Sequence, residues 1–399
     1  MSRCPDNRPS VLLVNWRDTR HPEGGGSERY VERIAEGLAQ LGYRVAIQCA
    51  DHGRAPLGNW VAGVRFRRRG NKFTVYLHAL LAILRSDADV IVDVQNGMPF
   101  FSRLVARCPV LVLVHHVHRE QWHSALGPFF GRIGWWIESW LAPRLYRKCR
   151  YITVSNVTRN ELAALGIELR RTVVVPNGLD APPAVVARPA QEPVLVAVSR
   201  LVPHKRLEHA IDLVARLAPV WPKLRLELVG EGPWKEVLRQ HAIDRGVADR
   251  VVIHGWVDEH RKHEILAGSW VHLCPSVKEG WGIVIMEAAA HGVPTVAYRS
   301  AGGVAEAIVE GETGLLAGDF DDFTKHVDAL LRDHPRRKAM GAAGRERAQK
   351  FSWEESLDAF ESVLHSVFAD PLSGARPLRP SGQSGRPILD NSRVAQQVE

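Results

Sequence analysis

Two glutamates, Glu279 and Glu287, flank the predicted start of a short helix, with Glu279 in the preceding loop and Glu287 about two turns further on. Gly280 and Gly282 lie at the helix start and lack the Cβ atom that keeps a ligand away from the backbone. Amide groups at a helix start have no intrahelical partner and suit an anion such as phosphate. Carboxylates accept hydrogen bonds from sugar hydroxyls. The segment is therefore compatible with a site in which one glutamate holds a sugar, the other a ribose, and the amides a phosphate.

An ordinary helix start with solvated glutamates is the alternative, because two glutamates at this spacing occur by chance in most proteins of this length. The neighbouring sequence defines the elements that position the pair. Residues 286–290 are good helix formers, Gly292 supplies a C-terminal cap, and Pro294 prevents continuation of the helix. Residues 295–298 are rich in strand formers. A loop, a short helix and a strand are predicted in this order.

The E-x7-E segment, together with residues 300–303, Glu306 and residues 311–316, resembles the signature of retaining glycosyltransferases of the GT-B fold, family 4 (glycosyl transferases group 1). The resemblance runs from about residue 11 to residue 364 in the same order. It implies an α/β protein with two Rossmann-like domains that face each other across a cleft. The nucleotide-sugar donor is then expected mainly on the second domain and the acceptor mainly on the first.

Two cations, Arg200 and Lys205, stand in a loop between a predicted strand at 194–198 and a predicted helix at 207–217. They resemble the pair that grips the donor diphosphate in this family. Arginine offers a planar fork and lysine a mobile point charge, and both suit phosphate. Either cation alone could be an ordinary solvated side chain, but their place directly after a strand favours the binding role.

Glycines follow the first predicted strand of the first domain, residues 11–14, and precede a helix whose apolar residues recur at i, i+4 spacing. Strand, glycine loop, helix and strand form a βαβ unit. A generic turn would also carry glycines. In the family the matching loop reaches over the donor phosphates and the acceptor, so Gly25 and Gly26 are predicted site residues.

Three histidines, His115, His116 and His118, follow the predicted strand at 109–114, where ligands bind in open parallel sheets. His115 matches the strand-end histidine that faces the donor sugar in similar transferases. Packed loop histidines are one alternative. A metal site is another, but the spacing matches no standard zinc motif, so no metal ligand is predicted.

Further donor-binding residues are expected at the ends of two other strands and in the loop after Glu279. The resemblance places the backbone of residues 255–257 beside the nucleobase. The complete set of remaining candidates is Gly230, Glu231, Gly255, Val257, Trp281 and Ile283.

The formal net charge of +8 suggests an anionic partner, which could be a nucleotide, a nucleic acid or a membrane surface. No compact nucleic-acid-binding motif is found, so no nucleic acid is expected. The five cysteines are scattered and fit neither a disulfide framework nor a zinc site, which favours a reduced, cytoplasmic setting. No apolar stretch approaches the length of a membrane span.

Two segments could nevertheless contact an anionic membrane. Residues 134–141 contain three tryptophans and lead into four cations at 144–150, as at a lipid interface. The second segment consists of the basic residues of 65–72 and the amphipathic stretch 73–84 that follows them. A core helix with a solvated basic end is the alternative for the tryptophan segment. A peripheral position on the inner face of the cell membrane is therefore an additional hypothesis.

The chain is expected to divide at a linker rich in proline and alanine. The predicted parts are an acceptor-binding domain at 1–182, the linker at 183–193, an NDP-sugar-binding domain at 194–350, a helix at 351–370 that crosses back to the first domain, and a disordered tail at 371–399. Ser352 is the predicted N-cap of the crossing helix.

The sequence thus predicts a retaining transferase that moves a hexose from an NDP-sugar, with UDP or GDP as the nucleotide, to an acceptor hydroxyl in cell-envelope glycolipid or polysaccharide synthesis. Catalytic roles are expected for His115, Arg200, Lys205 and Glu279, without a cofactor, because the cations can do a metal's work. Resemblance implies retention by a front-face route. Alternatives are a sugar-phosphate synthase, an NDP-sugar epimerase, or a non-catalytic binding protein at the membrane surface.

Overall fold

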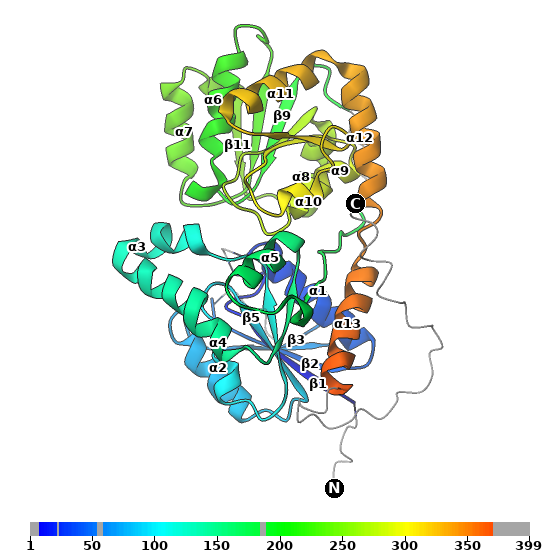
Figure 1. The fold of residues 1–399 in the computed structure, drawn as a ribbon. Coiled ribbons are helices and arrows are strands. Elements are labelled where there is room, and N and C mark those ends of the chain that lie inside the picture. The colour runs from blue at the N-terminus through cyan, green and yellow to red at the C-terminus, as the bar shows by residue number, and fades with distance from the viewer. Residues whose placement is uncertain (1–7, 22–23, 54–58, 184–188, 370–399) are drawn as a thin grey trace.

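The computed structural model describes residues 8–21, 24–53, 59–183 and 189–369. Within them the chain forms two α/β domains, each organised around one predominantly parallel sheet (Figure 1). The predicted fold class, two Rossmann-like domains, is confirmed. The predicted tail at 371–399 and the middle of the predicted linker lie outside the described residues.

The first sheet has eight strands in the order β3-β4-β2-β1-β5-β6-β7-β8, and every pair is parallel except β3 with β4. The strands are β1 Ser10–Val14, β2 Arg44–Cys49, β3 Trp60–Val61, β4 Val64–Arg68, β5 Val90–Gln95, β6 Val110–Val114, β7 Arg150–Thr153 and β8 Thr172–Val174. Their helices are α1 Gly26–Gln40, α2 Val75–Leu84, α3 Arg119–Trp136, α4 Ala142–Leu145 and α5 Asn156–Ala164, with a π-helical turn at Ile137–Leu141. Continuous apolar runs such as that of β6 are buried on both faces, as parallel sheets require.

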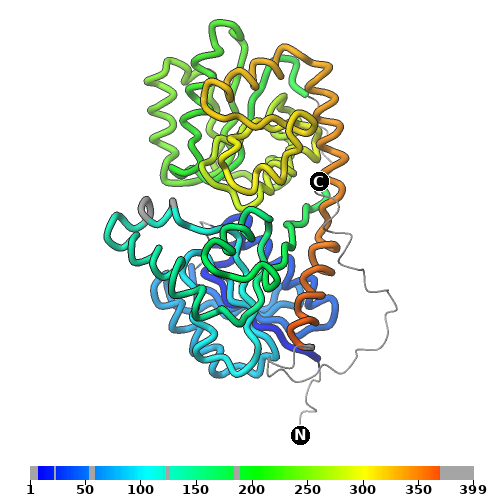
Figure 2. The backbone as a smooth tube through the Cα atoms, viewed as in Figure 1, coloured from blue at the N-terminus to red at the C-terminus, as the bar shows by residue number. Residues whose placement is uncertain are grey.

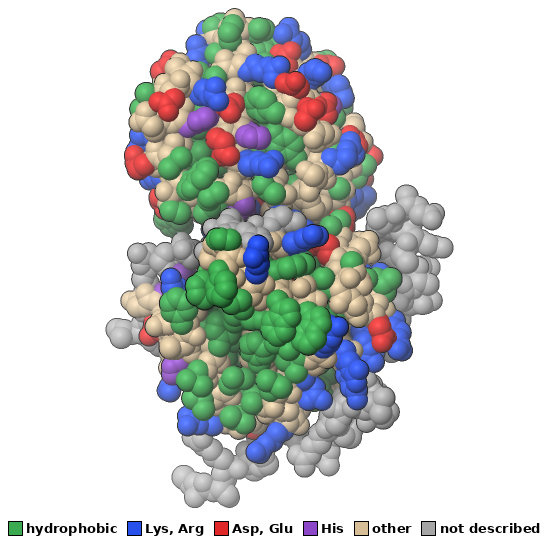
Figure 3. All heavy atoms as spheres, turned by 60° about the vertical axis from the view of Figure 1, so that its left-hand side comes forward, with side chains coloured by type: hydrophobic (Ala, Val, Ile, Leu, Met, Phe, Trp, Pro, Cys, Tyr) green, Lys and Arg blue, Asp and Glu red, His purple; other side chains and the backbone are tan. Residues whose placement is uncertain are grey.

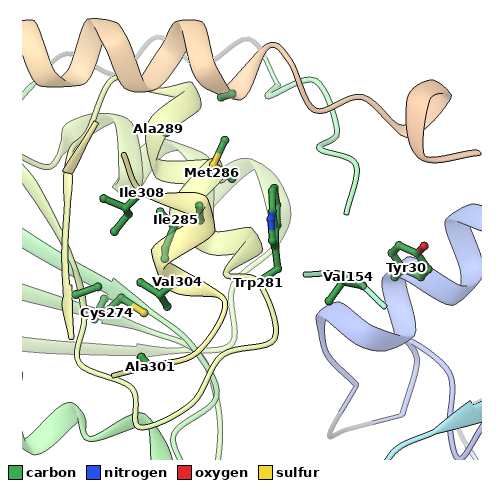
Figure 4. Close-up of a cluster of buried hydrophobic side chains, with 14 of the residues drawn as sticks. Tyr30, Val154, Cys274, Trp281, Ile285, Met286, Ala289, Ala301, Val304 and Ile308 are labelled. Atoms are coloured by element: carbon green, nitrogen blue, oxygen red, sulfur yellow. The ribbon is translucent and has the colours of Figure 1, made fainter. Parts of the chain in front are cut away.

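The second sheet has six parallel strands in the order β11-β10-β9-β12-β13-β14. The strands are β9 Val194–Val198, β10 Arg225–Val229, β11 Val251–Gly255, β12 Val271–Cys274, β13 Thr295–Tyr298 and β14 Gly314–Ala317. The helices are α6 Leu207–Leu217, α7 Lys235–Asp244, α8 Glu259–Gly268, α9 Ile283–Ala290, α10 Val304–Ala307, α11 Phe320–Arg332 and α12 His334–Ala348. Ile285, Met286 and Ala289 of α9 pack into the core of this domain, which fixes the start of the helix (Figure 4).

The strand order reverses at β1/β5 in the first sheet and at β9/β12 in the second. At such a switch point the loops leave in opposite directions and open a crevice beyond the carboxyl ends of the strands. The loop after β1 carries Gly25 and Gly26, the loop after β9 carries Arg200 and Lys205, and the loop after β12 carries Glu279. The topology therefore brings the main predicted site residues to the two switch points.

Two segments cross between the domains, one after β8 and one between α12 and α13 (Trp353–Ala369) (Figure 2). They lie side by side, because the amide of Leu179 donates to the carbonyl of Phe351 at 3.0 Å. Ser352 Oγ accepts from the amide of Glu355 at 3.1 Å at the start of α13. Helix α13 then packs on α1 of the first domain, where a Cβ on Gly37 would lie 2.5 Å from Leu357.

Within the basic stretch 65–72, Arg65, Arg69 and Lys72 are exposed as expected from the sequence, but Arg68 is not. Residues 64–68 form β4, which pairs with β2, and the side chain of Arg68 is only 5% exposed. Its Nε atom lies 2.6 Å from Oδ2 of the buried Asp18. Arg68 therefore neutralises an interior carboxylate and does not contribute a solvated charge.

Candidate active site

A cleft between the two domains is lined by residues from both sheets. The predicted residues that line it are Gly25, Gly26, His115, Arg200, Lys205, Glu279, Gly280, Trp281, Gly282 and Ile283. Gly230, Glu231, Gly255, Val257 and Glu287 are not among the cleft-lining residues. The structure thus brings together the predicted catalytic residues and the loop at 280–283 that was predicted to bind phosphate. The residues predicted to contact the nucleobase and the ribose lie outside this cleft.

Lys205 and Glu279 form an ion pair in the cleft, with Lys205 Nζ 2.5 Å from Glu279 Oε1. Ser276 Oγ donates to the same oxygen at 2.7 Å. Burial acts to raise the pKa of Glu279, but the Lys205 charge and these hydrogen bonds outweigh it, so the pKa is lowered. Glu279 is therefore an ionised acceptor at neutral pH, suited to hydroxyl groups.

His115 lies directly after β6 with its side chain buried and its ring edge against Tyr30, at 5.3 Å between ring centroids. Burial lowers the pKa of His115 to about 4, so the imidazole is neutral at pH 7. Thr158 Oγ1 donates to the carbonyl of His115 at 3.2 Å and fixes the backbone there. Among the described residues, no hydrogen-bond partner is found for His115 Nε2.

Three buried polar atoms on the cleft walls share this lack of a partner within the described part of the chain: His115 Nε2, Asn177 Oδ1 and His272 Nε2. The three residues are at most 8% exposed. A buried polar group without a hydrogen bond costs about 1–3 kcal/mol, so such groups call for a partner. Three of them around one cleft fit a ligand with several hydroxyl groups.

Glycines let the two domains approach closely at this cleft. A Cβ on Gly280 would lie 2.8 Å from the carbonyl oxygen of His115 in the other domain. A Cβ on Gly26 would lie 3.4 Å from Ile283, so the starts of α1 and α9 face each other across the cleft. Amides in the first turn of a helix have no partner within the helix and suit an anion, so both helix starts border a space where an anion could bind.

Sequence reasoning missed several residues of the cleft. Arg17 and Glu28 line it and form a buried ion pair, with Arg17 Nε 2.9 Å from Glu28 Oε1. Burial acts to raise the pKa of Glu28, but Arg17 and the amide of Gly25 reverse the effect, so the pKa is lowered. A glutamate three residues after a glycine loop is a sequence signal for helix capping, which could have indicated Glu28. Ser276 and Asn177 had no comparable signal.

Glu287 lies on α9 and contacts α8. Lys262 Nζ lies 2.9 Å from carboxylate oxygens of both Glu287 and Glu259. Burial raises the pKa of Glu287 in spite of Lys262. Glu259, His263 and Glu287 bring ligand atoms within 4.8 Å of one another, a spacing that a metal ion could use. The ammonium group of Lys262 already supplies positive charge between the two carboxylates.

The candidates at the ends of β10 and β11 form a separate group. Gly230 donates its amide to the carbonyl of Gly255 at 2.9 Å. Glu231 is exposed, pairs with Lys235 at 3.2 Å, and accepts from the amide of Trp256 at 3.3 Å. The Trp256 side chain is 76% exposed. This group offers backbone and an open aromatic ring at the domain edge.

Ion pairs and a helix cap hold the two domains together beside the cleft. The Glu306 carboxylate accepts from the amides of Asn156 at 2.9 Å and Val157 at 2.7 Å, at the start of α5 in the other domain. Lys278 pairs with Glu161 of the same helix. A carboxylate at a helix N-terminus is stabilised by both the hydrogen bonds and the helix dipole.

Family models match both domains. Glycosyltransferase Family 4 matches residues 24–181, and Glycosyl transferases group 1 matches residues 182–347. The chain belongs to glycosyltransferase family 4. The resemblance stated from the sequence is confirmed.

Two of the similar proteins are named for the synthesis of a glycolipid or a lipopolysaccharide. The chain is 40% identical over 197 residues to a GDP-mannose-dependent alpha-(1-6)-phosphatidylinositol monomannoside mannosyltransferase of Mycolicibacterium smegmatis, which covers 47% of this chain and 49% of that protein. It is 34% identical over 181 residues to the lipopolysaccharide core biosynthesis glycosyltransferase LpsE of Rhizobium meliloti, and this alignment covers 45% of this chain and 51% of that protein. The chain thus aligns with about half the length of these relatives.

Solved structures of glycosyltransferases share the fold over most of the chain. Sucrose-phosphate synthase from Thermosynechococcus elongatus matches with a TM-score of 0.74 at 20% identity, covering 91% of this chain and all of that one. Anabaena HepE in complex with UDP-glucose matches with a TM-score of 0.72 at 18% identity, and the match covers 90% of this chain and 99% of that one. This family 4 chain therefore has the GT-B fold.

Proposed function

We propose that the protein is a retaining glycosyltransferase that moves a hexose from a UDP- or GDP-sugar to an acceptor hydroxyl. The ion pair of Lys205 with Glu279 carries the proposal. It places a cation suited to phosphate and an ionised acceptor suited to sugar hydroxyls side by side at a switch point. The unpartnered atoms of His115, Asn177 and His272 add polar groups for a polyhydroxylated ligand.

The difficult step is departure of the nucleoside diphosphate while positive charge grows on the sugar ring. Arg200, Lys205 and the amides at the start of α9 are proposed to stabilise the departing diphosphate by fixed charge and dipoles. Glu279 is proposed to hold the sugar hydroxyls, and His115, neutral at pH 7, to position the sugar. These cations supply the stabilisation that a divalent ion would give, so the proposed reaction needs no metal.

The front-face route to retention is supported by the carboxylates of the cleft. Among the described residues that line it, the two carboxylates are Glu28 and Glu279, and both are ion-paired with lowered pKa. A general base works best with a pKa near the operating pH, which neither group has. We therefore propose that the departing phosphate, rather than a carboxylate of the cleft, deprotonates the acceptor.

A lipid-linked or polysaccharide acceptor in cell-envelope synthesis is proposed from the names of the relatives. Glu287 is proposed to reach the ribose once the ribose hydroxyls replace Lys262 as its partner. The backbone around Gly255 and Val257 is proposed to lie against the nucleobase. Gly230 and Glu231 belong to the same edge and are proposed as second contacts on the nucleotide.

The protein is further proposed to work as a peripheral protein on the inner face of a membrane. In the described part of the chain, no helix is long and apolar enough to cross a bilayer. Hydrophobic side chains gather on one face of the first domain and are bordered by lysine and arginine (Figure 3). Co-sedimentation with anionic vesicles tests this location, and failure to bind them at low salt would remove it.

The anomer of released sugar tests the transferase proposal. Slow hydrolysis of UDP-glucose or GDP-mannose, followed by proton NMR before mutarotation, is expected to show the α-sugar first. First appearance of the β-sugar would contradict retention. An NDP-sugar epimerase would instead change the sugar of the donor, and a sugar-phosphate synthase would require a hexose phosphate as acceptor, so the products separate the alternatives.

A further inference from the structure

The second half of α3 and the π-helical turn that follows it present an apolar stripe to solvent. Phe129, Ile133, Trp136 and Trp140 follow i, i+4, i+7 and i+11 spacing and are 70%, 43%, 49% and 44% exposed. This spacing places them on one face of a helix. A soluble helix normally turns such a face to the core, so this stripe points to an external apolar partner.

The charges around the stripe indicate an anionic lipid surface as that partner. Arg132, Arg144 and Arg147 are exposed, and the Arg144 guanidinium lies 4.2 Å from the centroid of the Trp140 ring. Within residues 126–148 the one carboxylate, Glu138, is buried. Apolar and indole side chains with basic neighbours and no exposed acid match the boundary between headgroups and acyl chains.

Glu138 points inward from the same segment and binds the histidine loop of the cleft. It lies in the π-helical turn at Ile137–Leu141, between the exposed Trp136 and Trp140. Its carboxylate accepts from the backbone amide of His118 at 3.0 Å and contacts His118 Nδ1 at 3.2 Å. Trp122 Nε1 donates to its other oxygen at 2.6 Å. One turn of chain thus carries the exposed apolar stripe on its outer side. On its inner side it carries Glu138, whose contacts with His118 and Trp122 form a buried clamp.

The clamp is closely packed and leads to the catalytic loop. A Cβ on Gly97 would lie 2.7 Å from the Trp122 ring, and a Cβ on Gly134 would lie 2.3 Å from it. The ring comes from the first half of α3 and is therefore wedged between the loop that follows β5 and the second half of α3. The His118 ring lies against that of His116 at 4.1 Å between centroids, with the ring planes tilted by 30°. These contacts connect the π-helical turn through Glu138 and His118 to the loop that holds His115.

We propose that Glu138 is a positioning residue that couples docking of the 129–140 face on an anionic membrane to the placement of the histidine loop 115–118. This inference rests on the proposed function, because it gives a transferase of lipid-linked acceptors a means to order its site only at the membrane. π-Helical turns recur at functional sites, and here the turn sets Glu138 inward while the tryptophans stay outside.

Hydrogen exchange of the full chain tests the coupling without a substrate. Vesicles of phosphatidylglycerol and phosphatidylcholine are expected to slow exchange in residues 128–141 and also in residues 115–122, and vesicles of phosphatidylcholine alone are expected to slow neither. Glu138→Gln should keep the protection at 128–141 and lose it at 115–122. Trp122→Phe, which keeps the wedge and removes one donor, should weaken the second effect.

Two controls separate coupling from misfolding. Glu168→Gln changes an exposed carboxylate of the same domain and should behave like the wild type. Phe129→Ser with Ile133→Ser should abolish vesicle protection at both segments, whereas Val237→Ser with Ile243→Ser, exposed positions on α7, should abolish neither.

Distinct outcomes would overturn distinct claims. Vesicle binding without a change at 115–122 in the wild type, or full protection there in Glu138→Gln, would overturn the coupling and leave the transferase proposal intact. Self-association through the stripe, seen as a dimer by light scattering that the serine variants abolish while vesicles fail to bind, would overturn the choice of lipid as partner.

Discussion

The Nζ atom of Lys205 lies 2.5 Å from Oε1 of Glu279, which joins the cation proposed for the diphosphate to the carboxylate proposed for the sugar. Lys205 and Ser276 hold Glu279 in its charged form, since they lower its pKa against the effect of burial. In the proposed reaction, donor binding would exchange partners within one preformed pair, which would limit reorganisation.

Glu279→Gln is expected to bind nucleotide nearly as the wild type does and to lower transfer about 100-fold, by analogy with removal of one preorganised polar group from other active sites. The amide keeps the size but loses the charge that holds Lys205 and the sugar hydroxyls. Nucleotide affinity by calorimetry and turnover with a donor sugar separate the two effects. Unchanged turnover would remove Glu279 from the mechanism.

Lys205→Ala is expected to weaken donor binding and chemistry together. A hydrogen bond to a charged group contributes about 1.5–3 kcal/mol, equivalent to roughly tenfold or more in affinity. The exposed Lys223, paired with Glu192 on the surface, gives a matched control as Lys223→Ala, which should leave affinity unchanged. Wild-type donor affinity in Lys205→Ala would argue against a phosphate contact.

Gly280→Ala is expected to reduce transfer by forcing the domains apart. The added Cβ would lie 2.8 Å from the His115 carbonyl oxygen, and backbone cannot yield as a side-chain end does. Gly268→Ala is the control, because a Cβ there meets nothing within 4 Å, and replacing glycine by alanine in a helix stabilises by up to about 1 kcal/mol. If both variants retain full activity, close approach of the domains at Gly280 is not needed for transfer.

Glu306→Gln is expected to favour a more open arrangement of the domains. The substitution removes the charge at the N-terminus of α5 and leaves one of the amides of Asn156 and Val157 facing an NH2 group, which cannot accept its hydrogen bond. Small-angle scattering should show a larger radius of gyration, and kcat/KM should fall. Glu310→Gln alters a surface pair with Arg299 and should change neither measurement; an identical scattering curve for Glu306→Gln would contradict the role of this cap.

Stability is expected to fall as pH decreases from about 6.5 to about 4. Burial lowers the pKa of His115, His263 and His272 to about 4, so the unfolded chain binds more protons in this interval and gains stability relative to the fold. Urea unfolding at several pH values measures the slope. His272→Gln should flatten it, and an unchanged slope would mean that His272 binds protons equally in the folded and the unfolded chain.

The fold was predictable where local patterns are strong. Helix α6 and strand β13 were predicted with the bounds that the structure shows, because cap residues, apolar periodicity and proline mark them. The burial of Arg68 was not predictable, since its partner Asp18 lies fifty positions away in the sequence and only the pairing of β4 with β2 brings them together.

The site was predictable to the extent that it follows strand ends. Arg200, Lys205, His115 and Glu279 meet in one cleft because the two switch points face each other. The partners of these residues could not be inferred in the same way. Contacts of Glu287 with Lys262 and of Glu306 with α5 depend on packing between helices and between domains, which leaves no periodic signal in the sequence.

A thermal-shift screen against UDP-, GDP- and ADP-sugars, in the presence of EDTA, tests the central claim most directly. A ligand at a hundredfold its dissociation constant stabilises by about 2.7 kcal/mol, which such a screen detects. One nucleotide series is expected to stabilise the protein without metal, to release sugar slowly, and to lose its effect in Lys205→Ala. If no nucleotide sugar stabilises the protein, the roles proposed for Lys205 and Glu279 are contradicted.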